Sequence, residues 1–145
     1  PFMLRWPAKV KPQVSDVFVC QMDLLASFAS LLGQTYPDKV DSENTLDAFL
    51  GKSKKEVVQP YYYVQFDNHA TGYRGLRTST HTFAVHATNG KIDETVLYDR
   101  TKDPYQMDNI AGQSPRLVRQ FNKQLKAWLL HTNDSFAHYL ETVTK

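Results

Sequence analysis

The histidines and the single cysteine are the side chains most able to carry chemistry, and their spacing argues against a shared site. Cys20 lies in an apolar segment, so a small buried hydrophobe is its simplest interpretation. His81 and His86 lie five residues apart on one predicted strand, so they point to opposite faces and cannot hold one metal ion. His131 and His138 are separated by a predicted helix break. Because nucleophile-elbow, phosphate-loop and dinucleotide motifs are also absent from the sequence, we predict no catalytic residue and no metal ligand here.

One polar loop and the strand after it offer candidate binding residues. His69 lies in the loop 67–72, and loops on rigid scaffolds often carry binding side chains. Arg74 follows closely, and a guanidinium suits an anionic or sugar ligand. Arg77 lies three residues further on and points roughly the opposite way on a strand. We therefore predict His69 and Arg74 as substrate-binding residues; the alternatives are an ordinary surface turn for His69 and a carboxylate-paired strand arginine for Arg74.

A small antiparallel sheet must position this loop. The alternating apolar pattern predicts four strands in sequence, at 57–66, 73–78, 80–88 and 92–98. Asn89-Gly90 joins the last two, and this dipeptide is the strongest short hairpin signal because a type I′ turn needs positive φ at both positions.

A long amphipathic helix follows the predicted sheet. Ser114 is a good N-cap and Pro115 suits the first helical position. Large apolar residues then recur at helical spacing from Leu117 to Trp128, so we predict that the helix covers one face of the sheet. We expect an α+β fold, with about four antiparallel strands packed against this C-terminal helix.

The N-terminal part has a different pattern. Phe2–Trp6 is a short, nearly continuous apolar run, which is typical of a strand covered on both faces. Asp23–Gly33 combines a candidate N-cap, apolar residues at helical spacing, many small residues and a terminal glycine. We predict a strand and a helix that belong to a larger sheet outside this chain.

Composition excludes two classes of partner. The 145 residues carry a net charge of +2 with dispersed lysine and arginine, which is too weak for a nucleic-acid footprint. No apolar run approaches the roughly 18 residues of a membrane span. The chain begins at Pro1 rather than Met, so we expect a fragment or a processed chain.

Leu97–Ala111 has an unusually particular order of turn-forming residues, and it leads to a family resemblance. This stretch and four others resemble, in order, the C-terminal third of the formylglycine-dependent, alkaline-phosphatase-like sulfatases. The five stretches are PFMLRWPAKVKP, SDVFVCQMDLLASFASLLG, GYRGLRTSTHTFAVH, LYDRTKDPYQMDNIA and the helix ending WLLHTND. The resemblance implies that 1–56 is the tail end of the catalytic α/β domain and that 57–145 is the C-terminal subdomain.

The resemblance also implies a chemistry that lies outside this chain. A parent sulfatase would hydrolyse a sulfate ester with a formylglycine, made from the cysteine of a C-x-(P/S)-x-R motif, beside calcium. Cys20 does not match that motif, since Met22 and Leu24 stand at the positions of Pro or Ser and of Arg. The segment itself is therefore expected to be non-catalytic and without a cofactor, with His69 and Arg74 on the rim of the substrate pocket.

The expected partners follow from the same resemblance. They are the N-terminal catalytic portion of the same parent chain and a sulfated small molecule or glycan, with no nucleic acid and no membrane. Apolar surface uncovered by truncation predicts self-association of the isolated chain or partial disorder at its N-terminal end. The resemblance to this family suggests a periplasmic, secreted or lysosomal location. The alternative function is a stand-alone binding or interaction module for a sulfated glycan.

Overall fold

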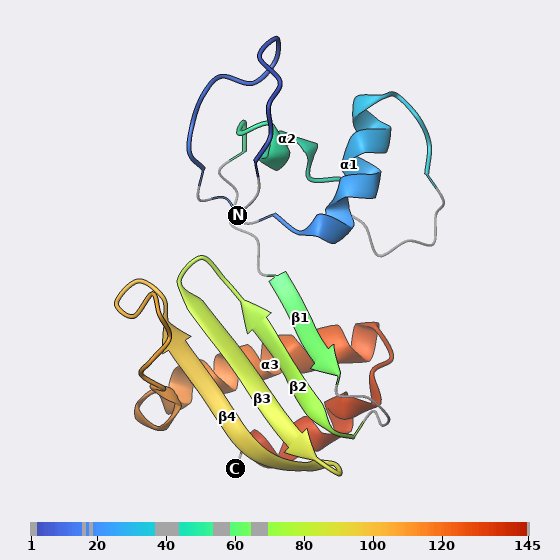
Figure 1. Cartoon of the computed structure of the whole chain (residues 1–145). Helices are drawn as coiled ribbons and strands as arrows, with labels where there is room; N and C mark the ends of the chain where they lie inside the picture. Colours follow the sequence, from blue (N-terminus) through green and yellow to red (C-terminus); the bar gives the residue numbers. More distant parts are fainter. Residues whose placement is uncertain are drawn as a thin grey trace. The chain divides into compact units, whose positions relative to one another are not determined.

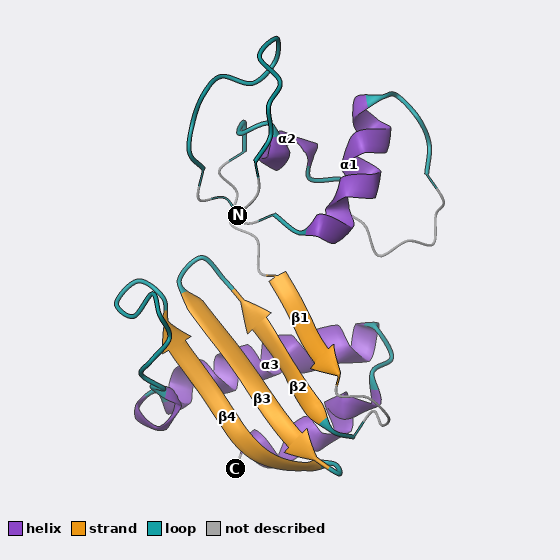
Figure 2. Cartoon of the chain, viewed as in Figure 1, coloured by secondary structure: helices purple, strands orange, loops and turns teal. Residues whose placement is uncertain are grey.

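The structure is a computed structural model that describes residues 3–15, 17, 19–36, 44–53, 59–64 and 70–144, without the side chains of 59–64 and 141–144. The chain divides into two compact units, Pro1–Val57 and Val58–Lys145. Figure 1 follows the chain through both units, and Figure 2 shows that the strands all belong to the second.

The first unit contains short helices. A 3₁₀ turn, Gln21–Asp23, leads into α1, Leu24–Leu31, and α2 covers Leu46–Phe49. Helix α1 confirms the predicted helix, and Gly33 ends it with a φ of 63°. Asp23 stands at the predicted N-cap but makes no side-chain cap hydrogen bond there, because its own backbone is already helical.

The predicted strand at Phe2–Trp6 is wrong for the residues that the structure describes. Met3–Trp6 has no regular secondary structure. A strand pairs its backbone N–H and C=O groups with a neighbouring strand. The sheet of the structure contains β1 to β4 and no strand from the first unit, so Met3–Trp6 has no described strand to pair with.

Helix α1 is only partly covered within the described residues. Its small residues Ala26 and Ser27 are fully buried. On another side Leu25, Phe28 and Leu32 are 53%, 46% and 70% exposed. These three residues, at i, i+3 and i+7, form an apolar stripe along one helix face.

The second unit contains the predicted sheet. The strands β1 Gln59–Val64, β2 Gly72–Arg77, β3 His81–Thr88 and β4 Lys91–Asp99 pair antiparallel in the order β1-β2-β3-β4. Asn89 and Gly90 have φ values of 50° and 76°, as the predicted hairpin turn requires. The α+β fold class is therefore confirmed.

Two helical segments cover one face of this sheet. Helix α3, Pro115–His131, crosses behind the strands in Figure 1, and η3, Ser135–Thr144, packs beside it. The rings of Phe83 on β3 and Phe121 on α3 stack with their centroids 5.8 Å apart. The buried core holds Leu76, Phe83, Val85, Ala87, Leu97, Val118, Phe121, Leu125, Leu129, Phe136, Ala137 and Leu140.

A buried ion pair fixes η3 against the sheet. The fully buried Arg74 of β2 donates from Nε to Oδ2 of Asp134 at 2.7 Å, across 60 residues of sequence. Its guanidinium carbon lies 4.6 Å from the ring centroid of Phe136. The second oxygen of Asp134 accepts the backbone N–H of Phe136 at 2.9 Å. One carboxylate thus joins the central sheet to the start of η3.

The segment between β4 and α3 is organised by side-chain hydrogen bonds. Asp99 accepts the hydroxyl of Thr101 at 2.5 Å and its backbone N–H at 3.0 Å. Asn109 accepts the N–H groups of Leu97 and Ala111 and donates to the carbonyl of Thr95. The 3₁₀ turn η2, Ala111–Gln113, then leads into α3. The predicted turn chemistry of Leu97–Ala111 therefore holds the exit of β4 against the start of the helix.

We predict that replacing Asp134 by alanine destabilises the second unit strongly. The substitution leaves the buried guanidinium of Arg74 without its carboxylate, which costs roughly 3–5 kcal/mol. Urea unfolding followed by tryptophan fluorescence measures the change in the free energy of unfolding. The matched control is Asp108→Ala, an exposed carboxylate, with an expected change within about 0.5 kcal/mol. Equal stability of the two variants would contradict the structural role of the pair.

We predict a contribution of Asp99 to the acid dependence of stability. The hydrogen bond from Thr101 is the main cause that lowers the pKa of Asp99 from 3.8 to about 2. Because the folded state holds this proton less tightly, the stabilisation is present above the ordinary pKa and is lost as pH falls towards about 2. In Asp99→Asn, unfolding free energy should fall less steeply between about pH 5 and pH 2 than in the parent. An unchanged slope, or the same flattening in Asp108→Asn, would refute this assignment.

Candidate functional site

The structure describes only one of the two predicted binding residues. His69 lies outside the described residues. Arg74 is described and is fully buried, with Nε on Asp134 and Nη1 3.2 Å from the carbonyl oxygen of Tyr73. The alternative interpretation of Arg74, a strand arginine paired with a carboxylate, is therefore what the structure contains. Substrate contact by either residue stays a prediction, and at Arg74 a ligand anion would compete with Asp134.

A row of polar and aromatic side chains crosses the opposite face of the sheet. Tyr73 on β2, His86 on β3 and Glu94 on β4 are aligned by the strand register. The rings of Tyr73 and His86 lie 4.5 Å apart at their centroids, and the Tyr73 hydroxyl donates to Glu94. Tyr73 with Glu94 is the first of two ionisable pairs that lie side by side near the β3–β4 turn.

The second pair in this row is His86 with Asp93. Nδ1 of His86 lies 2.5 Å from Oδ1 of Asp93, and Thr88 donates its hydroxyl to Oδ2 of the same carboxylate at 2.5 Å. The Thr88 hydrogen bond is the main cause that lowers the pKa of Asp93, and the His86 hydrogen bond adds to it. The hydrogen bond to Glu94 raises the pKa of Tyr73 to about 12. Asp93 is thus held as an acceptor and Tyr73 as a donor, which suits orientation of groups better than nucleophilic attack.

The described residues hold no assembled reactive centre. They contain no group of three or more His, Cys, Asp or Glu side chains able to hold a metal ion. Cys20 is partly exposed in the first unit, so its interpretation as a small buried hydrophobe is wrong. None of the described helices is long and apolar enough to cross a membrane.

The first unit contains an open hollow. Its lining includes Met3, Val14, Val19 and Phe49, and Arg5 is the one charged residue among the described side chains around it. The lining contains the hydroxyl of Ser15 but no carboxylate, histidine or cysteine among the described residues, so no acid–base pair or ligand cluster accompanies that hydroxyl.

Sequence reasoning missed two acidic partners: Asp134, which pairs with Arg74, and Asp93, which pairs with His86. Asp134 belongs to the helix break after α3, and the sequence offered only its turn-forming character as a signal. Asp93 follows the Asn89-Gly90 turn, so the hairpin register could have placed it near His86. The sequence did predict that His81 and His86 occupy opposite faces: His81 packs against Phe121 of α3, whereas His86 joins the outer row.

Comparison with known proteins gives a consistent result. Residues 1–134 match the family described as N-sulphoglucosamine sulphohydrolase, C-terminal. An N-acetylgalactosamine-6-O-sulfatase of Bacteroides thetaiotaomicron is 32% identical over 135 residues, covering 88% of this chain and 26% of that protein. An endo-4-O-sulfatase of the same organism is 25% identical over 152 residues, covering 92% of this chain and 30% of that protein.

Structural comparison points to the same class of protein. The crystal structure of a protein described as a sulfatase from Bacteroides fragilis has a TM-score of 0.85 and 49% identity, covering 93% of this chain and 30% of that one. The chain therefore spans between 26% and 30% of the length of these relatives. The resemblance predicted from the five sequence stretches is confirmed: the chain belongs to the N-sulphoglucosamine sulphohydrolase C-terminal family and is a C-terminal sulfatase segment.

Proposed function

We propose that this chain is the C-terminal part of a sulfatase that hydrolyses sulfate esters on a glycan. The observation that carries the proposal is the family match over residues 1–134, together with 32% identity to an N-acetylgalactosamine-6-O-sulfatase. An N-terminal catalytic portion of the same protein would supply the formylglycine nucleophile and the calcium ion. In this proposal residues 1–56 complete the catalytic α/β domain, and residues 57–145 form the C-terminal subdomain.

The contribution of this segment would be to the shape of the substrate pocket. Its described side chains offer hydrogen-bond donors and acceptors at fixed positions, in the Tyr73, His86 and Glu94 row above all. Such groups can orient a sugar without taking part in bond breaking. His69 remains a proposed rim residue, and Arg74 is proposed to position η3 through Asp134 if it does not contact the substrate itself.

We predict that the isolated chain releases no sulfate, because the nucleophile and calcium ligands belong to the proposed upstream portion. Sulfate release from a 6-O-sulfated N-acetylgalactosamine, with calcium present, is measured by ion chromatography. The isolated chain should match its heat-denatured control, whereas a protein that includes the upstream reading frame should turn over. Turnover by the isolated chain would refute the proposal.

Two cysteine variants provide a matched control in the longer protein. Replacing the cysteine of an upstream C-x-(P/S)-x-R motif by alanine should abolish sulfate release. Cys20→Ala should leave it unchanged, because Cys20 lacks that sequence context. Loss of activity in Cys20→Ala with normal folding would contradict the assignment of the nucleophile.

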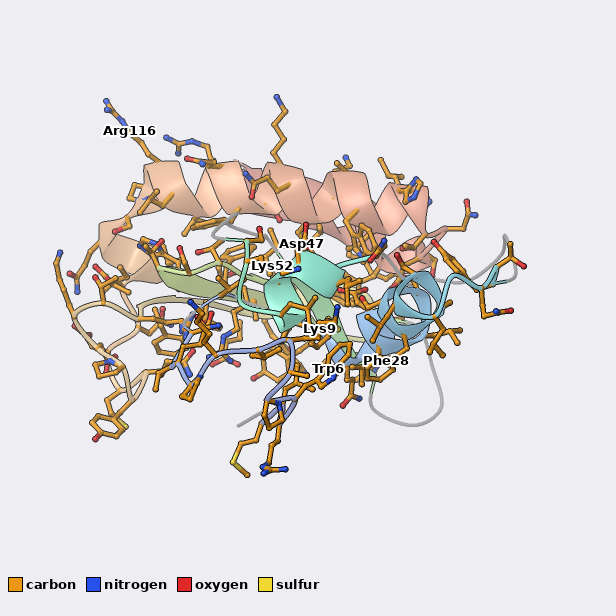
Figure 3. All side chains as sticks on the ribbon, turned by 90° about the horizontal axis from the view of Figure 1, so that it is seen from above. Trp6, Lys9, Phe28, Asp47, Lys52 and Arg116 are labelled. Atoms are coloured by element: carbon orange, nitrogen blue, oxygen red, sulfur yellow. The ribbon has the colours of Figure 1, made fainter. Side chains whose placement is uncertain are left out.

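We predict that the isolated chain self-associates through the apolar stripe of α1. The exposed side chains Leu25, Phe28 and Leu32 would be covered by the catalytic portion in the longer protein. Figure 3 labels Phe28 on this helix. Light scattering should show a mass that rises with concentration, and Leu25→Gln with Leu32→Gln should reduce it.

The control for the stripe is Leu130→Gln, which changes an apolar side chain of α3 that is 52% exposed. This variant should self-associate as the parent does. A parent chain that stays monomeric at every concentration would argue against an uncovered interface on α1.

A further inference from the structure

The outer face of α3 carries positive side chains and no negative ones. Arg116, Arg119 and Lys123 are exposed, and the helix Pro115–His131 contains no aspartate or glutamate. Residues three and four positions apart lie on one face of a helix, so the three cations form a stripe about 10 Å long, here called the basic stripe. Arg116 projects from α3 away from the sheet in Figure 3. The buried side of the same helix holds Val118, Phe121, Asn122, Leu125 and Leu129.

The stability of the helix does not explain the basic stripe. Arg116 stands in the first turn of α3, where the positive end of the helix dipole disfavours a cation. Lys123 follows Arg119 by four residues, and like charges at this spacing repel each other. No carboxylate of the described residues forms an ion pair with any of the three cations. The repulsion within the stripe is therefore unrelieved in this chain, and an anionic partner would relieve it.

The surroundings of the basic stripe favour a polysaccharide over a membrane or a nucleic acid. The apolar side of α3 is packed in the core, where Phe121 stacks on Phe83, so it is not free to enter a bilayer. The exposed side chains beside the cations are those of Gln120 and Gln124, whose amides can bind sugar hydroxyls. Residues 116–123 are all described and include no exposed aromatic side chain on which bases could stack.

We propose that the basic stripe binds a linear sulfated polysaccharide. The guanidinium groups of Arg116 and Arg119 suit the several oxygens of a sulfate group, and the ammonium group of Lys123 extends the contact along the polymer. Helix α3 covers one face of the sheet and the Tyr73 row lies on the other, so the stripe is separate from that row. Its role is to hold a polymer and not to orient the reacting sugar. The identity of the polyanion as a sulfated polysaccharide rests on the proposed function.

The first experiment titrates the whole 145-residue chain with chondroitin sulfate oligosaccharides, and with their desulfated form, by isothermal titration calorimetry. Binding should require sulfate and weaken with added sodium chloride, because the contacts are exposed charges. The triple variant Arg116→Gln, Arg119→Gln and Lys123→Gln should weaken binding roughly tenfold or more, since it removes every charge of the stripe. Glutamine is a good helix former, so the fold should persist, which circular dichroism verifies.

The matched control removes three positive charges from the first unit. Lys9→Gln, Lys11→Gln and Lys52→Gln change exposed lysines, and Figure 3 labels Lys9 and Lys52. The affinity of this control should equal that of the parent. If the stripe variant does not fold, Arg116→Gln with Lys123→Gln replaces it, and Lys9→Gln with Lys52→Gln becomes the control.

Three results of the titration would overturn the proposal. The first is the absence of sulfate-dependent binding in the parent. The second is equal weakening by the stripe variant and its control, because binding would then follow net charge alone. The third is an equal affinity for a DNA duplex or for phosphatidylserine vesicles at the same ionic strength, because the stripe would then not select a polysaccharide.

The longer protein separates the stripe from the proposed hydrolysis. The stripe variant should raise KM for sulfate release from chondroitin sulfate roughly tenfold, since the polymer is no longer held at a second point. It should leave kcat/KM for 6-O-sulfated N-acetylgalactosamine unchanged, because a monosaccharide makes no second contact. An unchanged KM for the polymer would contradict the proposal. If the longer protein releases no sulfate at all, the proposed function fails, and the calorimetric titration still decides whether the stripe binds the polymer.

Discussion

The pairing of Arg74 with Asp134 is the interaction on which the second unit depends most. A buried guanidinium is costly to desolvate and is tolerated only when a carboxylate and further acceptors compensate it. Asp134 meets this need from the turn after α3, and the same carboxylate accepts the N–H that starts η3. The strand therefore determines where the C-terminal segment docks, and Phe136 and Leu140 can then complete the core. Burial of apolar side chains supplies most of the stabilisation, whereas the ion pair selects the position at which η3 packs against the sheet.

Local signals account for the parts of the fold that could be predicted. The alternating residues of β3 and β4, the Asn89-Gly90 turn and the apolar spacing of α3 each act within a few neighbours, and all agree with one another. A carboxylate partner for Arg74 was one of the alternatives, but Asp134 could not be identified as that partner, because 60 residues separate the two and neither has a distinctive local pattern. The contact between the rings of Tyr73 and His86 could likewise not be predicted, because it depends on the register that aligns β2 with β3.

The N-terminal unit shows where sequence patterns mislead. Met3–Trp6 has the composition of a buried strand, yet strand formation depends on a partner and not on composition alone. Helix α1 forms because its hydrogen bonds are internal to the segment, and its apolar stripe nevertheless stays exposed. A helix can form without a neighbouring element, whereas a strand cannot satisfy its backbone hydrogen bonds alone.

The two faces of the sheet use charged groups for opposite purposes. On the α3 side, Arg74 is neutralised by Asp134 and contributes to a closed core. On the outer side, the carboxylates of Asp93 and Glu94 lie near one end, and the guanidinium groups of Arg77 and Arg100 lie near the other. Separation of charge along one face favours an oriented partner, because a reversed partner would meet like charges at both ends.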